Sequence, residues 1–449
     1  MHTHIEFINH SAVIISSADV RILCDPWFEG DAFHKGWNLI YENDDESIEQ
    51  ILERLTHIWI SHEHPDHFSV RFFIKYKQIL KRKKVTILFQ STRDRRVYSF
   101  LQAQGMVVQE LEDGKKTNIG ISGVKVTCYR DGFYDSALLF EYEGEKILNL
   151  NDCEVSTYDK AASMAKTVGE VDILLTQFSY AAWKGGVNNL QWRREAAAAK
   201  LETIKIQMNA FKPKFVIPFA SYIFFSNQLN KYLNDSINTP EKVLGHFSLS
   251  KASVIAMKPY DCFKGYFDRA AHDAALVFWS THYGQIHTRQ FHEYTTVSLV
   301  ELQKSYVLYQ TRIRNANQFW FMNLLRLISF FAILKPVILH IYDLHINLTV
   351  NLFSKRLEST SSEADLSLHS ESLNFLFNNS FGFDTLTVNG CFEEAKAGGF
   401  IRATKTLAIE NLNNLGIKLS PSILLNVKII RVFINKLFRV RRKLAAESR

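Results

Sequence analysis

Apolar positions recur with two different periods along the first 265 residues. Short apolar runs such as THIWI (56–60) and VTILFQ (85–90) have the length and β-branched content of buried strands. SIEQILERL (47–55) and VRFFIKYKQILKRKK (70–84) instead repeat apolar residues at helical spacing, which predicts amphipathic helices. Strands with interspersed helices favour an α+β domain of two packed sheets with helices outside.

This alternation of short strands and helices ends near residue 265, and we expect three regions: 1–265, 266–353 and 354–449. The second region is rich in aromatic residues and includes the long run FWFMNLLRLISFFAILKPVILHIYDL (319–344). We interpret that run as a buried helix pair or as a helix at a membrane surface. The third region opens with a Ser/Glu-rich stretch and predicts a small α+β unit.

Composition narrows the class of protein. The chain has 449 residues and a formal charge of +7, and no dense basic stripe marks the first three hundred residues, so we expect no nucleic-acid partner. Five scattered cysteines without C-x-x-C spacing argue against a disulfide framework and predict a reducing, cytoplasmic setting. The N-terminus lacks the pattern of a signal peptide, and apolar runs long enough to span a membrane are absent.

The stretch SHEHPDHF (61–68) carries the strongest chemical signal. His62, His64, Asp66 and His67 form the pattern H-x-H-x-D-H directly after the predicted strand THIWI. Imidazole and carboxylate groups are ligands for zinc, iron and manganese. We expect His62 and His64 to bind one metal ion, and Asp66 and His67 to reach a second position with a bridging water between the ions.

This pattern resembles that of the metallo-β-lactamase superfamily. CDPWF (24–28), GWNLIYE (36–42), TQFSYAAW (176–183) and PFASYIFFSNQLNKYLNDSINTP (218–240) further resemble the corresponding part of CMP-N-acetylneuraminate hydroxylases and, more loosely, hydrolases of the L-ascorbate-6-phosphate lactonase type. The resemblance covers residues 1–265. It implies a four-layer αβ/βα sandwich, here with a C-terminal helical and α+β extension, and one or two divalent ions, Zn or Fe.

The resemblance also directs attention to further ligands. ILNLNDC (147–153) matches the stretch that ends in the family's bridging carboxylate, which implies that role for Asp152. The stretch where a third histidine is expected contains Asp135 instead, and a carboxylate there would shift the preference towards harder metals. The final histidine is replaced by PFAS (218–221), and His246 downstream is a candidate substitute.

Other residues near these motifs are also candidates. The resemblance to the lactonase-like hydrolases implies that His10 lies near the active-site mouth, and a structural role is the alternative; we expect Asp25 to shape a loop beside the metal. Three tryptophans wall a pocket or pack in the core: Trp27, Trp37 and Trp183. Three basic residues meet an anionic group or belong to a solvated helix start: Lys184, Arg193 and Arg194.

Three functions remain open on this evidence. The first is a metal-dependent hydrolase of a small anionic substrate, for which the resemblance implies a sugar or nucleotide sugar. In this hydrolase, Asp66 or Asp152 orients the attacking water or accepts its proton. The second is an iron-dependent hydroxylase, which the resemblance implies. The resembled hydroxylases carry a Rieske iron–sulfur module, but its C-x-H…C-x-x-H ligands are absent from this sequence, so an external electron donor would be needed. The third is a binding protein with a degraded site.

The last residues form a separate prediction. From Lys428 to Lys443 there are seven basic residues and no acidic one, with apolar residues at near-helical spacing. A basic amphipathic helix of this kind packs on its own domain, contacts an anionic membrane peripherally, or binds a protein partner.

Overall fold

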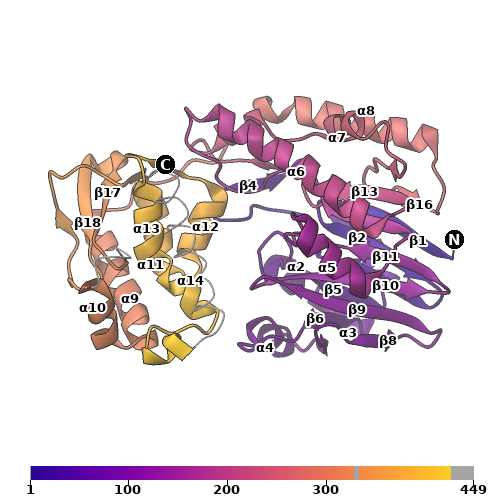
Figure 1. The fold of residues 1–449 in the computed structure, drawn as a ribbon, viewed down its shortest axis with the longest axis horizontal. Helices are drawn as coiled ribbons and strands as arrows, with labels where there is room; N and C mark the ends of the chain where they lie inside the picture. Colours follow the sequence, from indigo (N-terminus) through magenta and orange to yellow (C-terminus); the bar gives the residue numbers. More distant parts are fainter. Residues whose placement is uncertain (1, 328–332, 426–449) are drawn as a thin grey trace, which may run out of the picture. The chain divides into compact units, whose positions relative to one another are not determined.

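The computed structural model describes residues 2–327 and 333–425, and it divides the chain into two compact units. Unit 1 comprises Met1–Glu293 and Val388–Gly390, and unit 2 comprises Tyr294–Thr387 and Cys391–Arg449 (Figure 1). Unit 1 thus extends past the boundary expected at residue 265. The reason is helix α8 (Arg269–Gly284), whose Trp279 stacks on Tyr222 with ring centroids 4.0 Å apart.

Two seven-stranded sheets form the centre of unit 1. Sheet 1 has the order β16 (Cys262–Phe263), β1 (Thr3–Asn9), β2 (Ala12–Ser17), β3 (Val20–Cys24), β5 (His57–Ile60), β6 (Thr86–Gln90), β7 (Val107–Leu111). Sheet 2 has the order β15 (Ser253–Val254), β13 (Phe215–Phe219), β12 (Ile173–Gln177), β11 (Glu145–Asn149), β10 (Asp135–Tyr142), β9 (Val124–Asp131), β8 (Lys116–Ile119). A separate pair joins β4 (Trp37–Leu39) to β14 (Ile223–Phe225).

Successive residues of sheet 1 enter two different cores, because side chains alternate across a strand. Val13 and Ile15 belong to a cluster shared with strands of sheet 2, whereas Ile14 belongs to a cluster shared with helices. The helices of that second cluster are α1 (Asp45–Glu53), α2 (Val70–Lys75), α3 (Lys77–Arg82) and α4 (Arg96–Ala103). Strands buried on both faces explain why the sequence shows continuous apolar runs here.

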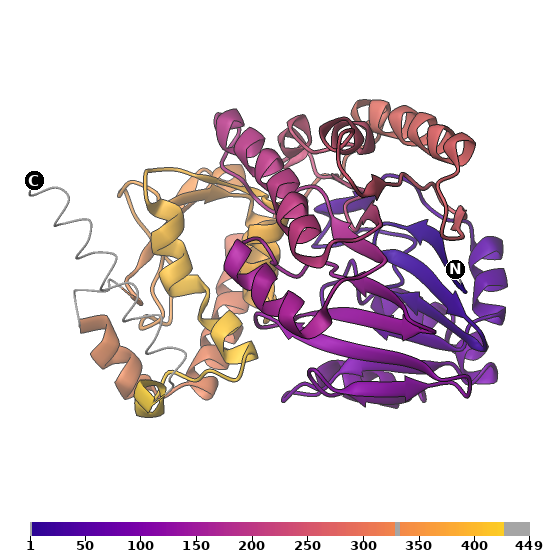
Figure 2. The same cartoon turned by 45° about the vertical axis from the view of Figure 1, so that its right-hand side comes forward.

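Helices α5 (Tyr158–Val168) and α6 (Leu190–Phe211) cover the outer face of sheet 2, and α6 packs on β12 (Figure 2). A shorter helix, α7 (Pro240–His246), contacts α8. Unit 1 is therefore the expected α+β sandwich of two sheets with helices outside. One local prediction is wrong: the helix expected over 70–84 is interrupted at Tyr76, which separates α2 from α3.

The strand directions bring many chain segments to one edge of the sandwich. β3, β5 and β6 are parallel to one another, as are β11, β12 and β13. β1 ends at the edge where β3 ends, and β10 begins at the edge where β11 ends. The residues that follow β3, β5 and β11 therefore meet the turn after β1 and the start of β10. Loops at the carboxyl ends of parallel strands are common places for binding sites.

Unit 2 is built on a five-stranded sheet of order β19 (Glu358–Ser359), β18 (Ile346–Val350), β17 (Val337–Ile341), β20 (Leu366–Leu368), β21 (Phe392–Glu394). Its helices are α9 (Leu299–Ala316), α10 (Phe319–Leu327), α11 (Ser370–Asn378), α12 (Gly382–Asn389), α13 (Gly399–Leu407) and α14 (Ile409–Asn414). Helices α9 and α11 pack together, and α13 packs on β17 and β20.

The helical character expected for 266–353 is only partly correct. α8, α9 and α10 are helices, but β17 and β18 form an antiparallel hairpin inside this region. Val337, Leu339 and Ile341 are buried in alternation with half-buried neighbours, and this period of two is that of a strand. α10 buries Phe321 and Met322 and exposes Trp320.

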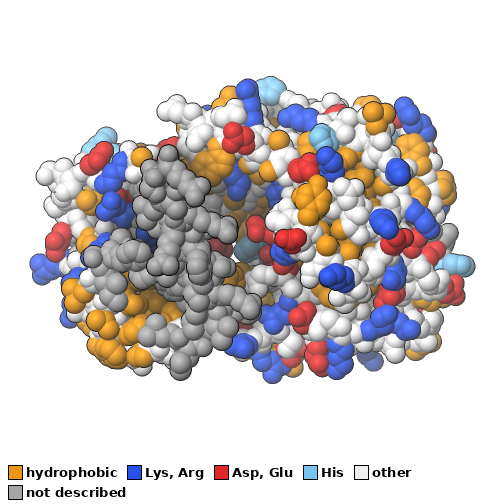
Figure 3. Space-filling view, viewed as in Figure 1, with side chains coloured by type: hydrophobic (Ala, Val, Ile, Leu, Met, Phe, Trp, Pro, Cys, Tyr) orange, Lys and Arg blue, Asp and Glu red, His pale blue; other side chains and the backbone are white. Residues whose placement is uncertain are grey.

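Charge is mixed on the surface of unit 1. On the face drawn in Figure 3, Lys and Arg side chains alternate with Asp and Glu side chains over this unit. Among the helices of residues 2–327 and 333–425, none combines the length and hydropathy of a membrane-spanning segment. The predicted basic helix of 428–443 lies outside the described residues.

Candidate metal centre

The H-x-H-x-D-H residues occupy a tight loop after β5. The backbone N–H groups of His67 and Phe68 both donate to the His64 carbonyl, at 3.0 and 2.7 Å, and this turns the loop back on itself. As a result His62 Nε2 lies 2.9 Å from His64 Nδ1. The His62, Asp66 and His67 side chains are buried, and His64 is half-buried.

Two carboxylates reach the same place from sheet 2. Asp135 is the first residue of β10, and its Oδ1 lies 3.7 Å from His62 Nε2. Asp152 follows β11, and its Oδ1 lies 3.6 Å from His67 Nε2. Apart from His246, the residues that the sequence suggested as ligands lie close together. Five of them form two groups whose donor atoms lie within 4.8 Å of one another: His62, His64 and Asp135, and His62, His67 and Asp152.

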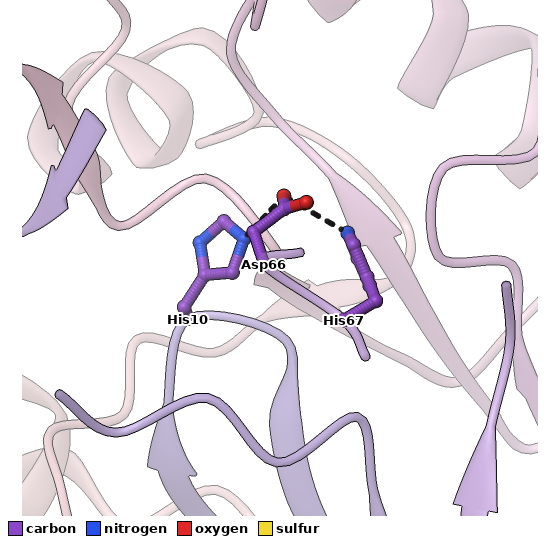
Figure 4. A group of neighbouring side chains, drawn as sticks. All are labelled: His10, Asp66 and His67. Atoms are coloured by element: carbon purple, nitrogen blue, oxygen red, sulfur yellow. Dashed lines mark ion pairs between the residues drawn. The ribbon is translucent and has the colours of Figure 1, made fainter. Parts of the chain in front are cut away.

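A third group adds a residue that was not among the predicted ligands. His10, in the turn between β1 and β2, lies with Asp66 and His67 within the same distance limit (Figure 4). His10 Nε2 is 3.4 Å from Asp66 Oδ2, and His67 Nε2 is 3.2 Å from that same oxygen. The sequence feature that could have identified His10 as a ligand is its place at the end of a predicted strand, in FINHSAVI (7–14).

Asp25 supports the H-x-H-x-D-H loop through buried hydrogen bonds. Its fully buried carboxylate accepts hydrogen bonds from the Ser61 backbone N–H at 2.7 Å and the Ser61 hydroxyl at 2.8 Å, and from the Asn151 side-chain amide. It also lies 3.2 Å from His67 Nδ1. Such a carboxylate fixes the orientation of the imidazole and leaves the opposite ring nitrogen, Nε2, for a ligand.

The backbone is strained where these side chains start. Four residues without the freedom of glycine have positive φ angles: His10 at 33°, Asp25 at 39°, Asn151 at 49° and Ala220 at 51°. All four follow strands at the same edge of the sandwich. Strain of this kind costs roughly 1–3 kcal/mol per residue and accumulates at functional sites, where the surrounding structure maintains it.

The electrostatics of the site favour a cation. Burial acts to lower the pKa of His67, but the Asp66 and Asp152 carboxylates outweigh it and raise that pKa well above its ordinary value. Burial acts to raise the pKa of Asp152, but the charge of His67 outweighs it and lowers the pKa to about 2. Carboxylates that hold a proton on His67 would attract a divalent cation for the same reason.

His62 and Asp135, which belong to the other donor group, have pKa values shifted towards their neutral forms. Burial lowers the pKa of His62 well below its ordinary value, and the His67 and His64 rings act in the same direction. Burial also raises the pKa of Asp135 to about 7, and the Asp152 charge adds to the effect. A neutral imidazole is the form that binds a metal ion. His62 is therefore already in the ligand form near neutral pH.

The donor atoms left without hydrogen bonds fit a metal ion. Among the described residues, buried atoms without a hydrogen-bond partner include His10 Nε2, Asp66 Oδ1 and His67 Nε2. Unpaired buried polar groups cost several kcal/mol, so their convergence at one place requires compensation. Imidazole nitrogens and carboxylate oxygens are the donors that zinc and iron accept.

Lys200 lies beside the carboxylates. This half-buried residue of α6 donates a hydrogen bond to the Gln177 side chain, and Gln177 Nε2 donates to Asp152 Oδ1 at 3.2 Å. Burial lowers the pKa of Lys200, whereas the charges of Asp152, Glu154 and Asp135 act to raise it. The Lys200 side chain is thus linked through Gln177 to Asp152, a partly exposed carboxylate at the rim of the site.

Several residues singled out from the sequence lie elsewhere or serve packing. His246 ends α7 and is exposed, outside the three donor groups of the described residues. Arg193 does not face an anion site, because its buried guanidinium binds Asp235 and the carbonyls of Gly186 and Val187. The three tryptophans are buried: Trp27, Trp37 and Trp183.

Comparison with known proteins agrees with this geometry. Residues 4–220 match a family described as the beta-lactamase superfamily domain. The match covers slightly less than half of the chain, which is similar to the beta-lactamase superfamily over these residues. As expected from H-x-H-x-D-H, the superfamily is one of metal-dependent enzymes, hydrolases and hydroxylases among them.

Individual proteins are similar to this chain over part of its length. The chain is 26% identical over 255 residues to the cytidine monophosphate-N-acetylneuraminic acid hydroxylase of Mus musculus, an alignment covering 52% of this chain and 41% of that protein. The matches to this hydroxylase and to that of Danio rerio cover 41% and 40% of those proteins, less than half of each. Two solved structures, both 13% identical, also match. One is CmlA, a diiron beta-hydroxylase from Streptomyces venezuelae, with TM-score 0.42 over 59% of this chain and 54% of that one. The other is a possible metal-dependent hydrolase from Veillonella parvula, with TM-score 0.44 over 59% and 99%.

Proposed function

We propose that unit 1 is a metal-dependent hydrolase with two adjacent ion positions. The observation that carries this proposal is the convergence of separate donor groups at one sandwich edge. His62, His64 and Asp135 would hold one ion. Asp66 and His67 would hold the other, and Asp152 lies between the two groups, 3.6 Å from His67 Nε2.

Bound divalent ions lower the pKa of water and polarise the scissile group, which is the chemistry hydrolysis needs. The side chains of the site position that water and accept its proton. Asp152 and Asp66 carry carboxylates that orient the water or accept its proton. Asp135 and Asp152 are more exposed than Asp66 and His67, with 26% and 22% of their side chains accessible against 3% and 0%, so substrate would approach from their side.

A small anionic substrate fits the rim of this site. Lys200 is linked through Gln177 to Asp152, and the positive charge offers a partner for a phosphate or carboxylate beside the scissile bond. Lys184 lies near Lys200, since the charge of Lys200 contributes, after burial, to lowering the pKa of Lys184. A sugar or nucleotide-sugar substrate agrees with the names of the curated relatives.

The test begins with the metal content of protein purified without chelators, measured by elemental analysis. The protein is then assayed for hydrolysis of a phosphodiester and of a lactone before and after removal of metal. We expect zinc and metal-dependent hydrolysis, abolished in Asp152→Asn and retained in Asp159→Asn, an exposed position on α5. Full activity in the stripped protein would contradict the proposal.

An iron-dependent hydroxylase is the second candidate. The observation that favours it is Asp135, a carboxylate beside His62 and His64, because carboxylate ligands suit iron better than an all-histidine set does. The curated relatives named above are hydroxylases. Iron after purification, and oxygen consumption with CMP-N-acetylneuraminate and an external reductant, would support this candidate. Absence of any retained metal would support a non-catalytic binding protein.

A further inference from the structure

His10 and Ala220 meet at the site edge although they belong to different sheets. The Ala220 backbone N–H donates to the His10 carbonyl at 2.7 Å, which joins the turn after β1 to the end of β13. Ala220 occupies the position after β13 at which a final histidine was expected and which offers no side-chain donor. The His10 backbone therefore lies against the strand end that lacks a ligand.

The His10 ring is buried without hydrogen bonds. Only 2% of the residue is exposed, and neither ring nitrogen has a hydrogen-bond partner within the described part of the chain. The ring packs edge-on against Trp27, with centroids 5.6 Å apart, which fixes its direction. A histidine this buried would normally donate or accept a hydrogen bond, whereas His10 Nε2 makes only a 3.4 Å ion pair with Asp66 Oδ2.

The polar atoms nearest to the ring lie at ligand spacing. His10 Nε2 is 3.4 Å from Asp66 Oδ2, and His67 Nε2 is 3.2 Å from it. Two donors bound tetrahedrally to one ion at about 2.0–2.2 Å are about 3.4 Å apart. Figure 4 shows the two imidazole rings on either side of the Asp66 carboxylate.

We propose that His10 is a metal ligand that completes the second ion position with Asp66 and His67. It supplies, from the first hairpin of sheet 1, the imidazole that the end of β13 lacks. The position then has two imidazoles and a carboxylate of its own before Asp152 contributes, which is a sufficient set for zinc or iron. This inference rests on the two-ion centre of the proposed function.

Cobalt(II) binding tests the assignment without an activity assay. The wild type, His10→Asn and His246→Asn are stripped of metal, reloaded with Co²⁺ and dialysed; cobalt per chain is measured by elemental analysis and the visible spectrum is recorded. Asn suits the left-handed backbone of His10 but cannot reach as far as the ring. His246→Asn is the control, because His246 is exposed and outside the donor groups of the described residues.

We expect two equivalents for the wild type and for His246→Asn, and one for His10→Asn, with loss of part of the cobalt absorption. Equal cobalt content and equal spectra for His10→Asn and the wild type would overturn the assignment. If His10→Asn is unfolded by circular dichroism, His10→Glu decides: a carboxylate that retains the second equivalent supports the ligand role, and its loss in a folded His10→Glu overturns it. A wild type that binds two ions without hydrolysing any substrate contradicts the proposed function and leaves the His10 assignment intact.

Discussion

Asp25 and His67 face each other at 3.2 Å, Oδ2 to Nδ1, and both side chains are completely buried. The contact joins the residue after β3 to the loop after β5, two neighbouring parallel strands. It directs His67 Nε2 towards Asp66 and Asp152. The orientation of this imidazole is thus set by a residue that is itself outside the three donor groups of the described chain.

Replacing Asp25 should weaken metal binding without removing a ligand. For Asp25→Asn we expect a loss of about 10- to 100-fold in metal affinity, the usual effect of removing a carboxylate behind a ligating histidine. Competition with a chromophoric chelator measures the affinity. Asp159→Asn is the control at an exposed position, and equal affinities for the two variants would contradict the orienting role of Asp25.

His64→Ala should remove most of the bound metal and leave the fold intact. The ring is half-buried, so its loss opens little of the core, and we expect the free energy of unfolding to change by less than about 1 kcal/mol. Elemental analysis and denaturant unfolding check the two parts of this prediction. The matched variant His246→Ala should bind metal as the wild type does, and unchanged metal content in His64→Ala would refute the ligand assignment.

Asp135→His should raise the preference of the site for zinc relative to iron. Exchanging a carboxylate for an imidazole softens the ligand set around His62 and His64. Anaerobic loading with equimolar Fe²⁺ and Zn²⁺, followed by elemental analysis, should give a several-fold higher zinc-to-iron ratio than in the wild type. Asp131→His, at the position paired with Asp135 across the β9–β10 hairpin, serves as the control and should leave the ratio unchanged.

Lys200→Met should weaken binding of small anions and spare the metal. The charge of Lys200 acts on Asp152 and Asp135 at the rim, so its removal takes away a partner for phosphate. Titration of the metal-loaded protein with inorganic phosphate should show a dissociation constant roughly tenfold higher, as for loss of one hydrogen bond to a charged group. Lys205→Met, an exposed position on α6, should bind phosphate as the wild type does. Equal phosphate affinity in Lys200→Met would exclude this subsite.

Peripheral contact with an anionic membrane is one of the three roles open to the basic C-terminal sequence, beside packing on its own domain and binding a protein partner. In the membrane role, seven basic residues between Lys428 and Lys443 would each contribute about 1 kcal/mol near such a surface. The full chain would then co-sediment with phosphatidylserine vesicles at low salt and be released at high salt, and a chain ending before Asn426 would remain in solution. Equal binding of both chains, or binding of neither, would rule out this contact.

Local sequence pattern was sufficient for much of unit 1. THIWI and VTILFQ became β5 and β6, because apolar β-branched runs of this length satisfy strands buried on both faces. H-x-H-x-D-H identified a cluster whose spacing forces its side chains into one loop. Where the local period was ambiguous, as at 337–350, the long apolar run concealed a hairpin, and only pairing between β17 and β18 decided its conformation.

The composition of the candidate site depended on tertiary structure. The sequence determined the loop residues His62, His64, Asp66 and His67, since they are neighbours along the chain. It could not determine that His10 would join Asp66, because that contact is created by the pairing of β1 with β2 and β2 with β3 and by the hydrogen bond from Ala220. Residues far apart in sequence meet only when parallel and antiparallel strands bring their ends to one edge, and strand order is a property of the folded sheets rather than of any local segment.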